Sequence, residues 1–134
     1  MAAIAVAVAG AIHVVESIEQ MTAPAAETIL AGAPVRIDTS GKFTNANGTT
    51  TTENRVYGIA DRSVIAGEAL TAIRRGVLDG FTFTQAYDAA IYLSDTDGTL
   101  ADTAGTVSTV VGRVIPAWGQ TVGTAADKLL LVNC

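Results

Sequence analysis

Short apolar segments, many of them alternating with polar residues, recur along the whole chain. The alternation is clearest at residues 87–94, where Ala89, Ile91 and Leu93 occupy one parity. A period of two residues is typical of a β-strand with one buried face, because successive side chains of a strand point to opposite sides. Gly, Asn, Asp and Thr separate the segments at short intervals, as expected of turns between antiparallel strands. The pattern therefore predicts one antiparallel β domain.

The same pattern predicts seven to nine short strands and little helix. We expect strands at residues 11–20, 33–38, 42–44, 56–60, 69–78, 81–84, 87–94, 107–115 and 128–133. Gly76 lies inside one of these segments and indicates a β-bulge or a bend. The continuous apolar run at 128–133 predicts a strand buried on both faces. Residues 21–33 fit either a short helical turn or an irregular crossing segment. Residues 45–54 are polar and contain the turn dipeptide Asn47-Gly48, which predicts an exposed, mobile loop.

The first eleven residues of the chain are uncharged and mostly apolar. The run is shorter than the about 18–20 residues that cross a bilayer as a helix, and no basic residue precedes it, as one would in a signal peptide. It is either an arm that docks on a partner surface or the first strand of the chain's own core. We take residues 1–11 as an apolar arm and residues 12–134 as a single β domain. In the arm interpretation the residues that contact the partner are Ile4, Val6, Val8, Ile12 and Val14.

Composition narrows the classes of function. The 134 residues include 8 basic and 13 acidic side chains, for a formal net charge of −5. A nucleic-acid-binding protein needs a basic surface to neutralise phosphates, so this balance argues against that class. Charged residues make up 16% and hydrophobic residues 49% of the chain, which favours a folded domain over a disordered one. Cys134 is the only cysteine, which excludes an intramolecular disulfide and predicts a free thiol at a frayed chain end.

No residue pattern points to a catalytic, cofactor-binding or metal-binding site. His13 is the only histidine, so a site with two imidazoles cannot be built. The segment Asp95-Thr96-Asp97-Gly98 begins like a calcium loop, but its glycine comes too early and Thr106 stands where a glutamate is needed. Arg74-Arg75 is the only dibasic pair, and its side chains either meet an acidic partner surface or are simply exposed. Trp118 is either an interface anchor or a core side chain.

Four segments of the chain resemble the capsid cement, or decoration, proteins of tailed bacteriophages. They read TAPAAETILAGAPVRIDTSGK at 22–42, VYGIADRSVIAGEALTAIRRGVL at 56–78, YDAAIYLSDTDGTLADT at 87–103 and VVGRVI at 110–115. The resemblance covers most of residues 22–132. It depends on Gly32, Val35, Gly41, Gly58-Ile59-Ala60, Gly67-Glu68, Gly76-Val77 and Gly112. These positions shape turns and strands, so no catalytic residue is carried over.

The resemblance implies a small β-barrel-like or β-tulip domain with an extended N-terminal arm. Such a protein binds the outer surface of an expanded phage head and clamps neighbouring major capsid subunits, often as a homotrimer. It would be made in the host cytoplasm and located on the virion, with no enzymatic activity, no cofactor, and no nucleic-acid or membrane partner. The arm residues named above and Trp118 are then the expected capsid contacts. The alternative is a non-catalytic, surface-displayed β module that binds a glycan or another ligand.

Overall fold

The fold is almost entirely β-structure. The computed structural model describes residues 3–6, 9–117, 122–124 and 127–134. The elements are β1 (Ala5–Val6), the 3₁₀ turn η1 (Ala9–Ala11), β2 (His13–Pro24), β3 (Pro34–Ile37), β4 (Phe43–Asn45), β5 (Val56–Ala60), β6 (Ala69–Asp79), β7 (Phe81–Thr82), β8 (Ala90–Leu93), β9 (Leu100–Ala101), β10 (Val110–Pro116) and β11 (Lys128–Asn133). No α-helix occurs within these ranges. The prediction of a mainly β domain with little helix is confirmed.

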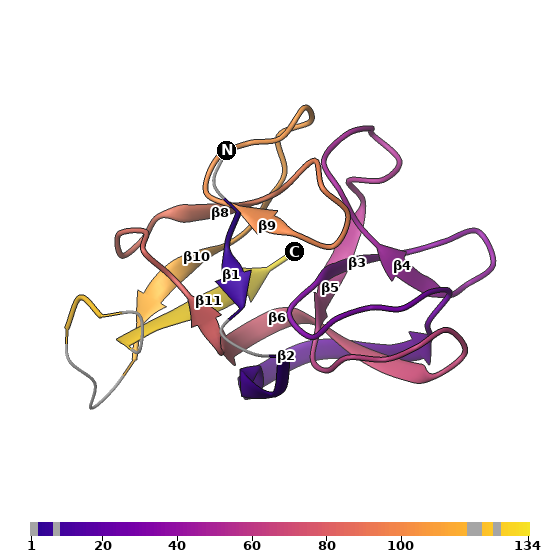
Figure 1. Cartoon of the computed structure of the whole chain (residues 1–134), viewed down its shortest axis with the longest axis horizontal. Coiled ribbons are helices and arrows are strands. Elements are labelled where there is room, and N and C mark those ends of the chain that lie inside the picture. The colour runs from indigo at the N-terminus through magenta and orange to yellow at the C-terminus, as the bar shows by residue number, and fades with distance from the viewer. Residues whose placement is uncertain (1–2, 7–8, 118–121, 125–126) are drawn as a thin grey trace.

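Nine of the described strands form one sheet that curls into a half-barrel (Figure 1). The strand order is β4-β3-β5-β6-β11-β10-β8-β9, and β2 pairs with β6 beside this path. The strands pair in antiparallel fashion throughout the sheet. β1 and β7 form a separate two-stranded ladder. The curl makes the molecule the small β-barrel-like domain that was expected.

β6 is the strand around which the domain is organised. One of its edges pairs with β2 over the whole length of the strand, from Ala69 opposite Pro24 to Asp79 opposite His13. Its other edge is shared, because the first half pairs with β5 and the second half with β11. With three strands attached to it, β6 links the two halves of the sheet and positions β2 along the outside.

Two hydrophobic cores meet at β6. Ile73 and its β5 partner Ile59 belong to the larger core, whereas the adjacent pair Ala72 and Ala60 belongs to the smaller one. Neighbouring residues of a strand point to opposite sides, so both faces of β6 are covered at this point. This explains why residues 69–78 show no clean alternation of apolar and polar positions. The larger core also holds Leu78, Phe81, Phe83, Ile91, Val111 and Leu130, and the smaller core holds Ile29, Val35, Phe43 and Leu70.

Glycines allow close approach of neighbouring strands at two positions. A Cβ on Gly76 would lie 2.2 Å from the carbonyl oxygen of Glu16 on β2. The register between β2 and β6 shifts beside this position, between Ser17 and Glu19, so the irregularity predicted at Gly76 is confirmed. A Cβ on Gly112 of β10 would lie 2.1 Å from the carbonyl oxygen of Leu131. Any side chain at either position would push the paired strands apart.

The structure decides the conformation of residues 21–33, for which two alternatives were open, and shortens the strand expected at residues 87–94. Residues 21–33 form no helical turn, because β2 continues to Pro24 and the chain then crosses irregularly. Backbone bridges from Ala25 to Phe43 and from Ile29 to Val64 hold this crossing segment in place. The alternating segment 87–94 is a strand only from Ala90 onward, since Asp88 has a φ of 66°. A positive φ is incompatible with extended backbone, so the strand begins after this residue.

The loop and the chain end are better anchored than expected. Ala46 and Asn47, at the base of the 45–54 loop, are buried instead of exposed. The side-chain oxygen Oδ1 of Asn47 accepts hydrogen bonds from the backbone N–H and the hydroxyl of Thr49. Cys134 is not frayed, because its N–H donates to the Arg74 carbonyl oxygen at 3.0 Å and its side chain packs against the larger core. Burial raises the pKa of the Cys134 thiol to about 12.

Candidate interaction surface

Three of the N-terminal residues predicted to contact a partner, Ile4, Val6 and Ile12, pack inward. Ile4 and Ile12 are only 7% and 6% exposed and belong to the larger core. Val6 is partly buried against the same core. In this structure Ile4 and Ile12 therefore do not present their side chains to a partner, contrary to the arm interpretation. Burying each isoleucine in the chain's own core contributes roughly 1.5–3 kcal/mol, which is the physical reason that the segment folds back.

The N-terminal segment packs closely against Gly32. A Cβ at this position would lie 3.1 Å from Val6 and 3.2 Å from both Ile12 and Phe81. Gly32 also has a φ of +84°, which an L side chain rarely adopts. The missing side chain thus makes room for the residues of the N-terminal segment. The Ile4 N–H adds a hydrogen bond to the backbone of Leu100, at 2.9 Å.

β2 lies along the edge of the molecule (Figure 1), and several of its exposed side chains are apolar. Among the described strands it pairs only with β6, and most of its twelve residues are exposed. Val14, one of the predicted contacts, is 40% exposed, and Val15 and Ile18 reach 56% and 65%. The predicted contacts Val8 and Trp118 lie outside the described residues.

Val15 and Ile18 are the β2 residues that have no partner on β6. They are skipped at two of the register shifts, between Val14 and Glu16 and between Ser17 and Glu19. Such bulges bend an edge strand and interrupt its row of backbone donors and acceptors. β2 therefore offers side chains, more than backbone, to another molecule. Neither Val15 nor Ile18 was among the predicted contacts. For Val15, an apolar residue out of phase with the alternation was the available signal.

The charged side chains at the centre of β2 are acidic. Glu19 forms an ion pair with Arg74 of β6 at 3.3 Å, and the Arg74 guanidinium lies 5.4 Å from the centre of the Tyr57 ring. Arg74 thus meets an acidic residue of its own chain, while Arg75 stays exposed. Because the Glu19–Arg74 pair is solvated, it contributes at most about 1 kcal/mol. Glu16 is exposed next to the two unpaired apolar residues.

A second apolar surface lies on the outer face of the sheet. In β11, Leu130 and Val132 point into the larger core, whereas Leu129 and Leu131 are only half-buried on the opposite face. The prediction that this strand is buried on both faces is therefore wrong for the isolated chain. A shallow groove of about 310 Å³ opens on this face of β8, β10 and β11. Its lining residues include Asp88, Ala90, Val110, Arg113, Leu131 and Asn133.

One exposed ion pair borders this outer groove. The Arg113 guanidinium donates to the Asp88 carboxylate at 2.7 Å, and both side chains are more than half exposed. A solvated pair of this kind contributes about 0–1 kcal/mol and is readily rearranged. Val110, at the start of β10, is exposed beside it. The groove thus combines apolar lining residues with an exposed ion pair at its border.

The segment that resembles a calcium loop joins two loops of the chain. Asp95 accepts hydrogen bonds from the N–H and the hydroxyl of Thr106, at 2.8 and 2.9 Å. Asp97 accepts one from the side-chain amide of Asn47. Within the ranges that the structure describes, no group of three or more His, Cys, Asp or Glu side chains is placed to hold a metal ion. These carboxylates bind donors of their own chain, which gives them a structural role.

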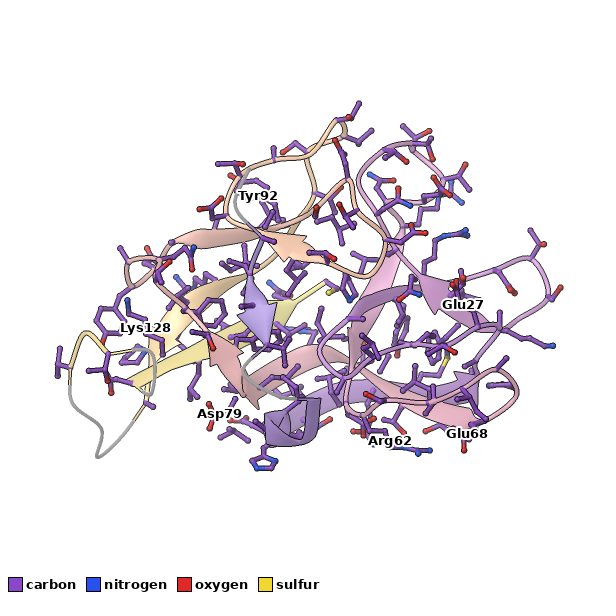
Figure 2. The ribbon with its side chains drawn as sticks, in the orientation of Figure 1. Glu27, Arg62, Glu68, Asp79, Tyr92 and Lys128 are labelled. Atoms are coloured by element: carbon purple, nitrogen blue, oxygen red, sulfur yellow. The ribbon has the colours of Figure 1, made fainter. Side chains whose placement is uncertain are left out.

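A buried polar cluster lies at the start of β11. Lys128, labelled in Figure 2, is buried and donates through Nζ to the Gln85 carbonyl oxygen at 2.6 Å. The Tyr87 hydroxyl donates to the buried carboxylate of Asp127, and this hydrogen bond raises the pKa of Tyr87. Lys128 Nζ also lies 5.4 Å from the centre of the Tyr87 ring. These contacts join the segment before β8 to the start of β11.

The described residues contain no helix long and apolar enough to cross a membrane. No protein family model matches the sequence, and no curated protein matches it either. A functional conclusion therefore depends on the sequence resemblance and on the surfaces described above.

Proposed function

We propose that this chain is a structural decoration protein of a tailed-phage capsid. It binds the outer surface of an expanded head, beside further copies of itself arranged as a homotrimer, and clamps neighbouring major capsid subunits. The observation that carries the proposal is β2, a twelve-residue strand on the molecular edge with Val14, Val15 and Ile18 exposed. Exposed apolar side chains concentrated on one element are typical of a surface that contacts another protein.

The physical requirements of decoration suit such a domain. A contact repeated many times over a shell needs only modest affinity at each copy, because linked contacts reinforce one another. The antiparallel half-barrel supplies a rigid body, and the net charge of −5 keeps it soluble and away from the packaged DNA. No step of this function requires a catalytic group or a cofactor.

Co-sedimentation with phage heads tests the proposal. The full-length protein is mixed with expanded and with unexpanded heads of the phage that encodes it, and the pellets are assayed for bound protein. Saturable binding to expanded heads alone is the expected result, because only expansion exposes the sites that a clamp joins. Absence of binding to either form would contradict the proposal. Specific binding on a glycan array, without binding to heads, would instead favour the ligand-binding alternative.

A further inference from the structure

Two apolar surfaces of this domain are uncovered, namely the β2 edge (Val14 to Glu19) and the outer groove on β8, β10 and β11. We propose that they cover each other between copies, so that the β2 edge of one copy docks in the outer groove of the next. The inference depends on β2 as a contact surface, as in the proposed function, and not on a capsid.

The chemistry of the β2 edge disfavours a simple pairing of β2 with itself. Its central charges, Glu16 and Glu19, are both acidic, so two β2 edges side by side would bring like charges together. The bulges at Val15 and Ile18 also disfavour the addition of a straight strand. The complement of the β2 edge is therefore a surface that accepts apolar side chains and supplies a cation.

The outer groove has this chemistry. Ala90, Val110 and Leu131 line it with apolar surface on which Val15 and Ile18 can pack. Arg113 supplies the cation, and its exposed ion pair with Asp88 is weak enough to share the guanidinium with the Glu16 of another copy. Such a contact would also bury Leu131, which is half-buried in the single chain. β11 would then be buried on both faces, as its continuous apolar sequence predicts.

The two surfaces cannot meet within one copy. In the sheet order, β6 and β11 lie between β2 and β10, so the β2 edge and the groove belong to different parts of the same sheet. A contact between different surfaces of identical copies is heterologous, and it closes into a ring if the rotation between copies permits. The homotrimer of the proposed function is such a ring.

Sedimentation velocity of mixed variants tests this pairing in solution, without heads. Ile18→Asp disables the β2 edge and Val110→Asp disables the groove, and both side chains are exposed, so the fold is retained. The native chain is expected to form a closed assembly. Each variant alone should associate about 30-fold more weakly or worse, the effect of losing an interface hot spot. A mixture of the two variants should form a 1:1 pair, because one intact edge can still enter one intact groove.

The control variant is Ile65→Asp, which changes an equally exposed apolar residue outside both surfaces. It should assemble like the native chain, and thermal unfolding followed by circular dichroism confirms that each variant is folded. A monomeric native chain, native assembly by the Val110→Asp variant, or a mixture that remains monomeric would each overturn the inference. Head binding of the native chain is measured separately by co-sedimentation, so a failure of this pairing can be distinguished from a failure of the proposed function.

Discussion

Individual residues decide how closely the segments of this domain approach one another. Gly32 leaves space for Val6, Ile12 and Phe81, and Gly76 lets β2 run against β6. Glycine at these positions is required by neighbouring atoms, in contrast to Gly41, where a Cβ would meet nothing within 4 Å. Gly32 and Gly41 have nearly the same positive φ, +84° and +79°. They therefore form a matched pair in which only the surroundings differ.

Replacing Gly32 by alanine should lower the free energy of unfolding by roughly 2–4 kcal/mol, since backbone strain and overpacking add. Gly41→Ala should lower it by only about 1 kcal/mol, from backbone strain alone. Urea denaturation of both variants measures the difference. Equal decreases in the free energy of unfolding would show that the N-terminal segment is not tightly packed around Gly32.

The partly buried thiol of Cys134 should react slowly while the protein is folded. A pKa of about 12, against an ordinary value of 9.0, leaves the thiolate about 1,000-fold rarer near neutral pH. The raised pKa means that the folded state retains a proton that the unfolded state loses. The contribution of this thiol to the free energy of unfolding is therefore fully present below pH 9 and decreases as the pH rises from 9 toward 12.

Labelling with a thiol reagent at pH 8, in buffer and in urea, measures this protection of Cys134. Rapid labelling of the folded protein, at the rate seen in urea, would contradict the burial of the side chain.

At the scale of elements, β6 and the N-terminal segment determine how the domain is closed. β6 carries β2 on one edge and both β5 and β11 on the other, so it belongs to both cores. The N-terminal segment adds Ile4 and Ile12 to the larger core although the main sheet does not contain β1. The segment is thus part of the folded body, and β2, which directly follows it, is the element left exposed.

An alanine substitution just before β2 should therefore change the free energy of unfolding more than an alanine substitution at an exposed position within β2. Ile12→Ala removes a buried side chain and should lower the free energy of unfolding by about 2–4 kcal/mol. Val15→Ala removes an exposed one and should change it by less than about 0.5 kcal/mol. Thermal and urea denaturation of both variants give the comparison. A negligible effect of Ile12→Ala would mean that the segment is not anchored in solution as it is in the structure.

For the whole molecule, the distribution of apolar residues matters more than their number. The two cores take most of the large apolar side chains, and several of the remaining ones lie on the β2 edge and the outer groove. The charges near these surfaces are few and exposed, and their ion pairs contribute little to stability. The cores thus cover most of the large apolar side chains, and the β2 edge and the outer groove leave apolar surface on which another molecule can pack.

The sequence alone predicted most of the elements. The segments around β2, β3, β5, β6, β10 and β11 follow from local alternation, β-branched residues and turn dipeptides, all of which are properties of neighbouring residues. The bulge near Gly76 was also predictable, because a glycine inside a strand pattern has few other uses. The start of β8 was not, since the positive φ of Asp88 depends on its surroundings and not on the residue type.

The candidate surface was predicted only in part. Val14 was identified and is exposed, whereas Ile4 and Ile12 were identified by the same apolar pattern and are buried. Local sequence determined that this chain forms a β domain and which segments are apolar. Only the tertiary structure decided which apolar segment is covered, because burial depends on residues that are distant in sequence. Gly32 and Leu100 contact the N-terminal segment and hold it against the core, whereas β2 remains at the edge.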